Sequence, residues 1–123
     1  MKISILNPTH KSSHLEELYD SIKYQDFYEW IIIENSNAKT PQTIVQDSRV
    51  KIWYQDSPNN YVGQLKKFAC ERATGDILLE VYHDDLLTPT AIEEVKKTFE
   101  DPEVGFVYSL NISLRCRLEI KDS

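Results

Sequence analysis

The feature that most constrains the fold of this chain is the alternation of short apolar runs with amphipathic stretches. The alternation predicts repeated βαβ units, and hence an α/β fold whose sheet is mainly parallel, has about five strands and carries helices on both faces. Residues 110–120 alternate apolar and polar side chains, which predicts a half-buried strand at the edge of this sheet. The apolar runs that predict the other strands are residues 3–6, 30–33, 50–54, 77–81 and 104–108.

The amphipathic stretch at residues 15–22 predicts the first helix. Ser13 and Glu16 have the spacing of a capping box, so Ser13 is predicted to cap the helix. The apolar residues of the stretch recur at i, i+3, i+4 and i+7, which is one face of a helix. They are Leu15, Leu18, Tyr19 and Ile22.

Three more helices follow from the pattern. A short one is predicted at residues 41–46, and a longer one at residues 61–73, ended by Gly75. Thr88 and Pro89 are typical of the N-cap and first position of a helix. The apolar face of that last helix is expected at Ile92, Val95 and Phe99.

Length and composition limit the class of protein. The 123 residues suit a single domain with one core, spanning residues 1–123. Hydrophobic residues make up 41% and charged residues 28%, as in ordinary globular proteins. No apolar run approaches the ~20 residues that span a bilayer, and the apolar stretch at the start is too short for a signal peptide. We therefore expect no membrane span and a cytoplasmic location.

Charge and cysteine content restrict the partners further. The net charge is −6 and no block of five or more basic residues occurs, so a nucleic-acid partner is not expected. The same acidic balance would repel a phosphorylated ligand unless a cation or a local Lys or Arg intervened. Cys70 and Cys116 have no metal-ligand spacing and are expected to be unpaired thiols.

Polar clusters follow three of the predicted strands. They are Pro8-Thr9-His10, Glu34-Asn35-Ser36-Asn37 and His83-Asp84-Asp85. Parallel strands bring their carboxyl ends to one edge of a sheet, where open α/β sheets bind their ligands. This convergence is the main indication of a binding site, because each cluster alone says little.

Asp84 and Asp85 are the strongest candidates for metal ligands. Adjacent carboxylates repel each other, and a divalent cation relieves that repulsion. Their hard oxygen ligands suit Mg²⁺ or Mn²⁺. The alternative is that Asp85 only caps the turn before the next helix. His83 could be a further ligand or a solvated turn histidine, whereas His10 and His14 have no paired spacing and are expected at the surface.

Several other residues allow both a binding and a structural interpretation. Glu34 follows a buried strand, where its carboxylate could accept a hydrogen bond from a base N–H or lie in a solvated turn. Thr9 could bond a ligand or cap the following segment. Tyr61 could stack on a base or pack at the rim. Lys66 and Lys67 could contact phosphate or form a solvated helix face.

The chain lacks the best-known nucleotide-binding motifs. Neither GxGxxG nor a Walker A sequence occurs, so a dinucleotide-binding or P-loop site loses its main support. A nucleotidyltransferase would need a basic, glycine-rich loop after the first strand, and residues 7–13 contain no glycine.

The order of these clusters resembles that of family 2 glycosyltransferases. The resemblance runs from residue 2 to about residue 108, and the Asn-Ser-Asn of the second cluster is similar to that of spore-coat-polysaccharide type members. The family's Asp-x-Asp-Asp element falls on residues 82–85. The other matching segments are Pro8-Thr9, Leu15-Glu16-Glu17-Leu18, Ser21-Ile22, Ala73-Thr74-Gly75-Asp76, Pro89 and residues 104–108.

The resemblance implies a fold, a ligand and a set of site residues. The fold would be the Rossmann-like GT-A fold, and the activity would be inverting transfer of a sugar from a nucleotide-diphospho-sugar, as in polysaccharide biosynthesis. The donor would be a UDP-sugar, bound with a divalent metal held by Asp84 and Asp85. The acceptor, a glycan or another hydroxyl, is not identified. The implied nucleotide-binding residues are Pro8, Thr9, Glu34, Asn35, Tyr61 and Asp84.

The chain also departs from the family pattern. Ile33 and Tyr82 stand where the family has acidic residues. The family's catalytic base and acceptor loops lie beyond the matched region, so donor binding is better supported than transfer. The alternative is a non-catalytic nucleotide-sugar-binding or protein-interaction module. In either case, apolar surface left by an absent acceptor half would favour a homodimer.

Overall fold

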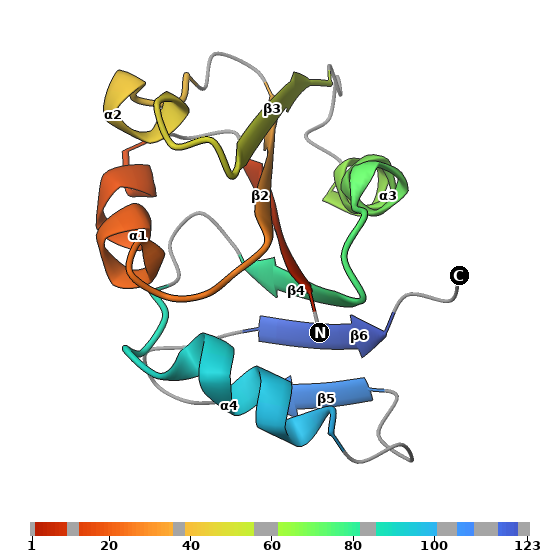
Figure 1. Cartoon of the computed structure of the whole chain (residues 1–123). Helices are drawn as coiled ribbons and strands as arrows, with labels where there is room; N and C mark the ends of the chain where they lie inside the picture. Colours follow the sequence, from red (N-terminus) through yellow and green to blue (C-terminus); the bar gives the residue numbers. More distant parts are fainter. Residues whose placement is uncertain are drawn as a thin grey trace.

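The computed structural model describes residues 2–9, 13–35, 39–55, 62–81, 86–100, 106–109 and 116–120, with residues 62–64, 66, 106–109 and 116–120 described by their backbone alone. In this part of the chain strands alternate with helices, as the sequence predicts (Figure 1). The elements are β1 (Ile3–Thr9), α1 (Leu15–Ile22), β2 (Glu29–Glu34), α2 (Gln42–Val45), β3 (Val50–Tyr54), α3 (Val62–Arg72), β4 (Ile77–Val81), α4 (Ala91–Thr98), β5 (Phe106–Ser109) and β6 (Cys116–Ile120).

The strands form one sheet in the order β3-β2-β1-β4-β6-β5. Strands β3, β2, β1 and β4 are parallel to one another. The chain runs outward from β1 through β2 to β3 and then returns to the other side of β1 at β4. The strand order therefore reverses between β1 and β4, and the carboxyl ends beside such a reversal are where open α/β sheets bind ligands.

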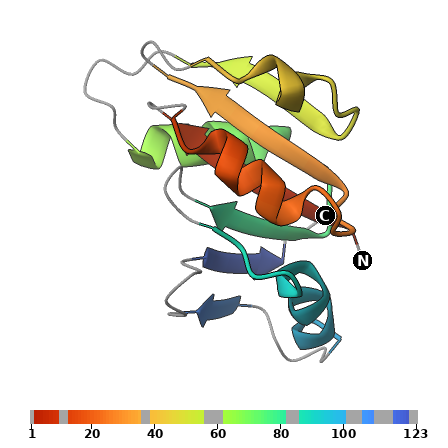
Figure 2. The ribbon, with the colours of Figure 1, turned by 90° about the vertical axis from the view of Figure 1, so that its left-hand side faces the viewer.

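Helices cover both faces of the sheet. Figure 1 shows α1 and α2 on one side and α3 on the other, and Figure 2 shows α1 in front of the strands with α3 behind them. The buried side chains of α4 belong to the same core cluster as those of α1. This arrangement confirms the predicted α/β fold with a layer of helices on each face.

The core has two parts, one on each face of the sheet. Strand β2 contributes to both, because Trp30 and Ile32 pack on the α1 face while Ile31 and Ile33 pack on the α3 face. All four side chains are fully buried, as the unbroken apolar run predicts. The α3 face is completed by Leu6, Leu65, Ala69, Ala73 and Leu78.

The last strand is not where the sequence places it. β6 lies inside the sheet, antiparallel to both β4 and β5, and β5 forms the edge. Only six residues separate β5 from β6, and so short a connection favours an antiparallel pair. The alternating pattern therefore predicted the strand but not its position in the sheet.

The predicted helix caps are also wrong. The residue at the N-cap of α1 is His14 rather than Ser13, and α4 begins at Ala91, after Thr90 rather than after Thr88. Gln25 explains the start of α4: its side-chain Nε2 donates to Thr88 O at 2.8 Å and its Oε1 accepts from Ile92 N at 2.9 Å. An amide distant in sequence thus caps α4, which local patterns cannot reveal.

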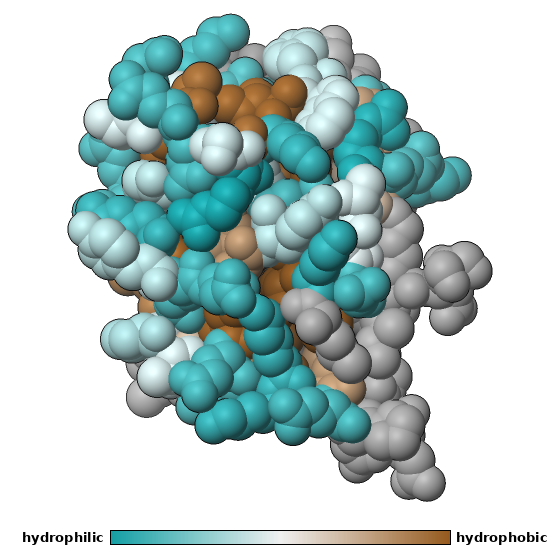
Figure 3. Space-filling model, in the orientation of Figure 1, coloured by the Kyte–Doolittle hydropathy of each residue, from teal (hydrophilic) through white to brown (hydrophobic). Residues whose placement is uncertain are grey.

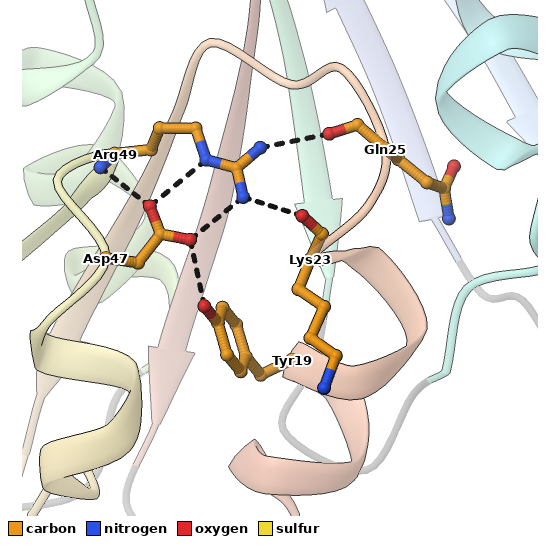
Figure 4. Close-up of polar contacts among 5 residues, drawn as sticks. All are labelled: Tyr19, Lys23, Gln25, Asp47 and Arg49. Carbon is orange, nitrogen blue, oxygen red and sulfur yellow. Dashed lines mark hydrogen bonds and ion pairs between the residues drawn. The ribbon is translucent and has the colours of Figure 1, made fainter.

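Arg49 ties the end of α1 to the turn before β3 (Figure 4). Its guanidinium donates to the carbonyls of Lys23 and Gln25 at 2.8 and 3.0 Å and pairs with Asp47 at 2.8 Å. The Tyr19 hydroxyl donates to the same carboxylate at 3.0 Å. These contacts, led by the hydrogen bonds from Arg49, hold the pKa of Asp47 well below its usual value. The network fixes α1 against the sheet.

Candidate functional site

The ends of β1 and β2 bring two of the predicted polar clusters together. Thr9 and Glu34 are register partners, and Asn35 N donates to Thr9 O at 2.9 Å. Thr9 is buried and Glu34 is half-buried. We call the ends of the four parallel strands, at Thr9, Glu34, Tyr54 and Val81, the carboxyl edge of the sheet.

Glu34 is the last residue of β2, and its carboxylate is partly engaged. Its Oε2 accepts a hydrogen bond from the backbone N–H of Thr40 at 2.7 Å. This contact holds the segment at residues 39–41 near the strand end. The glutamate is therefore more than a solvated turn residue, although its predicted contact with a base stays a prediction.

Two asparagines bind neighbouring strand ends to each other. Asn35 is fully buried, and its Nδ2 donates to Gln55 O at 2.7 Å, just after β3. Asn7 is fully buried as well, and its Nδ2 donates to Val81 O at 2.7 Å, at the end of β4. Sequence reasoning missed Asn7, because Asn7-Pro8 is also typical of the turn that ends a strand. A polar residue directly before a proline in an apolar strand was the signal.

Pro8 lies within β1 and pairs with Ile33. The structure thus extends β1 beyond its predicted end at residue 6, as far as Thr9. Tyr61, Asp84 and Asp85 lie outside the described residues, as do His10 and His83, so their predicted roles stay predictions. Lys67 is exposed on α3.

The described residues contain no group of three His, Cys, Asp or Glu side chains able to hold a metal ion. Asp84 and Asp85, the predicted cation ligands, lie outside the described residues. Val81, whose carbonyl accepts the hydrogen bond from Asn7 Nδ2, directly precedes residues 82–85 in the sequence.

The opposite edge of the sheet contains a buried carboxylate that the sequence did not reveal. Glu29, at the start of β2, is fully buried. Its oxygens accept hydrogen bonds from Ser4 Oγ at 2.6 Å, Lys51 Nζ at 2.7 Å, and the N and Oγ1 of Thr74 at 2.7 and 3.0 Å. We call this region, with the starts of β1, β2 and β4, the amino edge.

These donors control the ionisation of Glu29. Burial alone would raise the pKa of Glu29, but the hydrogen bonds from Lys51, Ser4 and Thr74 outweigh it and lower the pKa to about 2. Glu29 is therefore an anion at neutral pH with its oxygens engaged by the fold. Such a group suits a structural role better than a catalytic one.

Gly75 completes the amino edge rather than ending α3, which stops at Arg72. Its N–H donates to Ser4 Oγ at 2.8 Å. A Cβ at this position would lie 2.5 Å from Ser4 Oγ and 2.8 Å from Lys2 O. A glycine is needed here because the loop passes too close to β1 for a side chain.

The face of the molecule drawn in Figure 3 is mostly polar. Figure 3 shows hydrophobic residues as small areas among hydrophilic ones on the face it presents. Large exposed apolar side chains come from different elements and loops: Tyr24, Tyr28, Val45, Tyr54 and Leu86. Among the described helices, none is long and apolar enough to cross a membrane.

Solved structures of similar fold support this description of the sheet. The mannosyltransferase PcManGT of Pyrobaculum calidifontis, solved with GDP-Man and Mn²⁺, matches with a TM-score of 0.75 and 21% identity, over 89% of this chain and 35% of that one. TarS of S. aureus, as its 1–349 fragment, matches with a TM-score of 0.69 and 22% identity, over 88% of this chain and 35% of that one. TarS has also been solved with UDP-GlcNAc.

The sequence comparisons identify the family. "Uncharacterized protein y4gI" of Sinorhizobium fredii (strain NBRC 101917 / NGR234) is 25% identical over 118 residues. The match covers 87% of this chain but only 13% of that protein. Residues 4–116 match the profile of Glycosyl transferase family 2. Since this match takes in most of the sequence, the chain belongs to glycosyl transferase family 2.

Proposed function

We propose that this chain binds a nucleotide-diphospho-sugar at the carboxyl edge, with a divalent cation, as the donor-binding part of a glycosyltransferase. The observation that carries the proposal is the register pair of Thr9 and Glu34 beside the point where the strand order reverses. Membership of the family supports transfer of a sugar as the reaction. This chain spans about a third of the length of the solved relatives. Sugar transfer by the whole protein is therefore proposed as well.

The nucleoside is assigned to the ends of β1 and β2. One oxygen of Glu34 accepts from Thr40 N, which leaves the carboxylate a second acceptor oxygen for a base N–H. Uracil N3–H is such a donor, and the guanine N1–H is another. TarS is solved with UDP-GlcNAc and PcManGT with GDP-Man, so both bases belong in the test. Tyr61 is assigned to the edge of the base and Pro8, Thr9 and Asn35 to its surroundings.

The diphosphate is assigned to Asp84 and Asp85 through Mn²⁺ or Mg²⁺. The chain carries a net charge of −6, so a diphosphate needs a cation to approach two carboxylates. The cation would stabilise the negative charge of the departing nucleoside diphosphate. PcManGT contains Mn²⁺, which supports this choice of metal. Transfer would be inverting, with attack by an acceptor hydroxyl whose identity is open.

The test is a calorimetric titration with UDP and GDP in Mn²⁺, in Mg²⁺ and in EDTA. We expect binding of at least one of the two nucleotides with a cation, and none in EDTA. Equal affinity in EDTA would exclude the cation bridge, and no binding of either nucleotide under any condition would overturn the proposed function.

A pair of variants assigns the carboxylate. Asp85→Ala should abolish cation-dependent binding. Asp76→Ala is the matched control, because it removes the same charge from an exposed position whose Oδ2 accepts from Lys2 N at 2.8 Å, far from the carboxyl edge. Unchanged binding by Asp85→Ala would instead favour the alternative in which Asp85 only caps the turn before the next helix.

A further inference from the structure

The backbone of β1 bonds to its two neighbours in alternation. Lys2 O accepts from Ile77 N at 3.1 Å, on the β4 side, and Ile3 O accepts from Tyr28 N at 2.9 Å, on the β2 side. Successive residues of a strand direct their N–H and C=O groups to opposite sides. The even-numbered residues of β1 therefore face β4, and Pro8 is one of them.

Pro8 interrupts the ladder between β1 and β4. Leu6 is the register partner of Glu80, so the N–H of residue 8 would be the next donor and Val81 O its acceptor. Proline has no N–H. The Nδ2 of Asn7 donates to Val81 O at 2.7 Å instead. A side chain thus supplies the hydrogen bond that the backbone of the following residue cannot make.

Replacing the backbone hydrogen bond by one from the Asn7 side chain has an energetic penalty at the other polar atom of that side chain. Asn7 is fully buried, and within the described part of the chain its Oδ1 has no hydrogen-bond partner. Burying an unpaired amide oxygen is unfavourable, so an apolar residue at this position would avoid that penalty. An asparagine here is explained by the need to satisfy and hold Val81 O.

We propose that Asn7 is a positioning residue that fixes the carboxyl end of β4 at Val81, the strand end that directly precedes the segment bearing Asp84 and Asp85 in the sequence. This inference rests on the proposed function for the meaning of that segment. Val81 is the last residue of β4, and residue 82 follows it directly. The hydrogen bond of 2.7 Å to its carbonyl holds Val81 against β1.

A double-mutant cycle tests the proposal. The variants are Asn7→Leu, Pro8→Ala and the double variant, and each is measured by its melting temperature and by titration with UDP and GDP in Mn²⁺. Asn7→Leu should lower Tm by about 3 °C or more, because Val81 O loses its donor. It should also lower the affinity for the nucleotide at least tenfold. In the Pro8→Ala background a backbone N–H is available at residue 8, so the same change should weaken binding less than threefold.

Ser4→Ala is the control for a general loss of stability, because Ser4 lies at the amino edge of the same strand. It should lower Tm and leave nucleotide affinity unchanged, whereas Asn7→Leu should change both. If Ser4→Ala weakens binding as much as Asn7→Leu, affinity follows stability alone and the positioning role is wrong.

The remaining outcomes of the cycle also support or overturn the positioning role of Asn7. Rescue of folding by Pro8→Ala, where Asn7→Leu alone does not fold, supports the proposal. Equal effects of Asn7→Leu on Tm and affinity in the two backgrounds overturn it. If the unaltered chain binds neither nucleotide, the proposed function fails and the positioning role falls with it, while the Tm cycle still shows whether Asn7 replaces the missing N–H.

Discussion

The amino and carboxyl edges of the four parallel strands both contain buried polar side chains, but these side chains are used differently. At the amino edge Glu29 receives four hydrogen bonds, and Ser4 and Gly75 close the network around it. At the carboxyl edge the donors of Asn7 and Asn35 hold strand ends together, while Asn7 Oδ1 is left without a partner in the described part of the chain. At the amino edge the charge of Glu29 is fully hydrogen-bonded within the fold, which stabilises it. The second edge holds its strand ends in fixed positions, and it is the edge where we propose that the nucleotide binds.

The largest effect on stability is expected from Glu29→Ala. The change leaves the donors on Ser4, Lys51 and Thr74 without their acceptor. Removing one partner of a buried charged network costs about 3–5 kcal/mol in the free energy of unfolding. Urea denaturation measures this loss, and nucleotide affinity at low urea should not change. A loss below ~1 kcal/mol would mean that the amino edge does not stabilise the fold in this way.

The next largest effect is expected at the carboxyl edge, where Glu34→Gln should lower the affinity for the nucleotide. Glutamine keeps one oxygen for Thr40 N but replaces the other with an NH₂ donor, which cannot accept from a base N–H. Losing a hydrogen bond to a charged group costs about 1.5–3 kcal/mol, or roughly ten- to a hundredfold in affinity. Calorimetry should show this loss for UDP or GDP, and little change for inorganic diphosphate. If the affinities for the nucleotide and for inorganic diphosphate fall equally, Glu34 does not contact the base.

The buried Glu29 of the amino edge should also make the free energy of unfolding depend on pH. The pKa of Glu29 is about 2 in the folded chain, against an ordinary value of 4.5. A lowered pKa stabilises the fold fully above pH 4.5, and this contribution is lost as the pH falls through about 2. We expect a loss on the order of 2 kcal/mol from this residue over that range. Glu29→Gln should flatten the curve of unfolding free energy against pH, and an unaltered slope would contradict the assignment.

A smaller loss is expected from Gly75→Ala. The added Cβ would lie 2.5 Å from Ser4 Oγ and 2.8 Å from Lys2 O, so the loop must shift. Overpacking of this kind costs about 1–3 kcal/mol. Adding Ser4→Ala should recover only part of the loss, because the contact with the Lys2 carbonyl remains. Full recovery in the double variant would show that the backbone contact is unimportant.

The sequence predicted the parts of the fold that depend on local pattern. The bounds of β3 and β4 were predicted correctly, and the apolar spacing of α1 placed Leu15, Leu18 and Ile22 in the core. Apolar periodicity reports which side of an element is buried, and burial dominates the choice of structure. The cap predicted at Thr88 failed because Gln25, distant in sequence, supplies the cap of α4.

The site was predicted less completely. Convergence of the first two polar clusters is confirmed by the pairing of Thr9 with Glu34, because parallel strands bring their ends together. The Glu29 network escaped prediction, since Ser4, Lys51 and Thr74 lie 22 to 45 residues from Glu29. The donor role of Asn7 needs the register of β1 against β4. A single sequence does not give that register.

One measurement tests the central claim most directly, namely that ligand binds at the carboxyl edge and not at the amino edge. Backbone amide spectra of the ¹⁵N-labelled chain are recorded with the bound nucleotide and Mg²⁺, and then with small additions of Mn²⁺. The two edges are separated by roughly 20 Å along β1. We predict shifts at Thr9 and Asn35, and paramagnetic broadening centred on the carboxyl edge, with Thr74 and Gly75 unchanged. Broadening centred on Thr74 and Gly75, or shifts confined to them, would contradict the account.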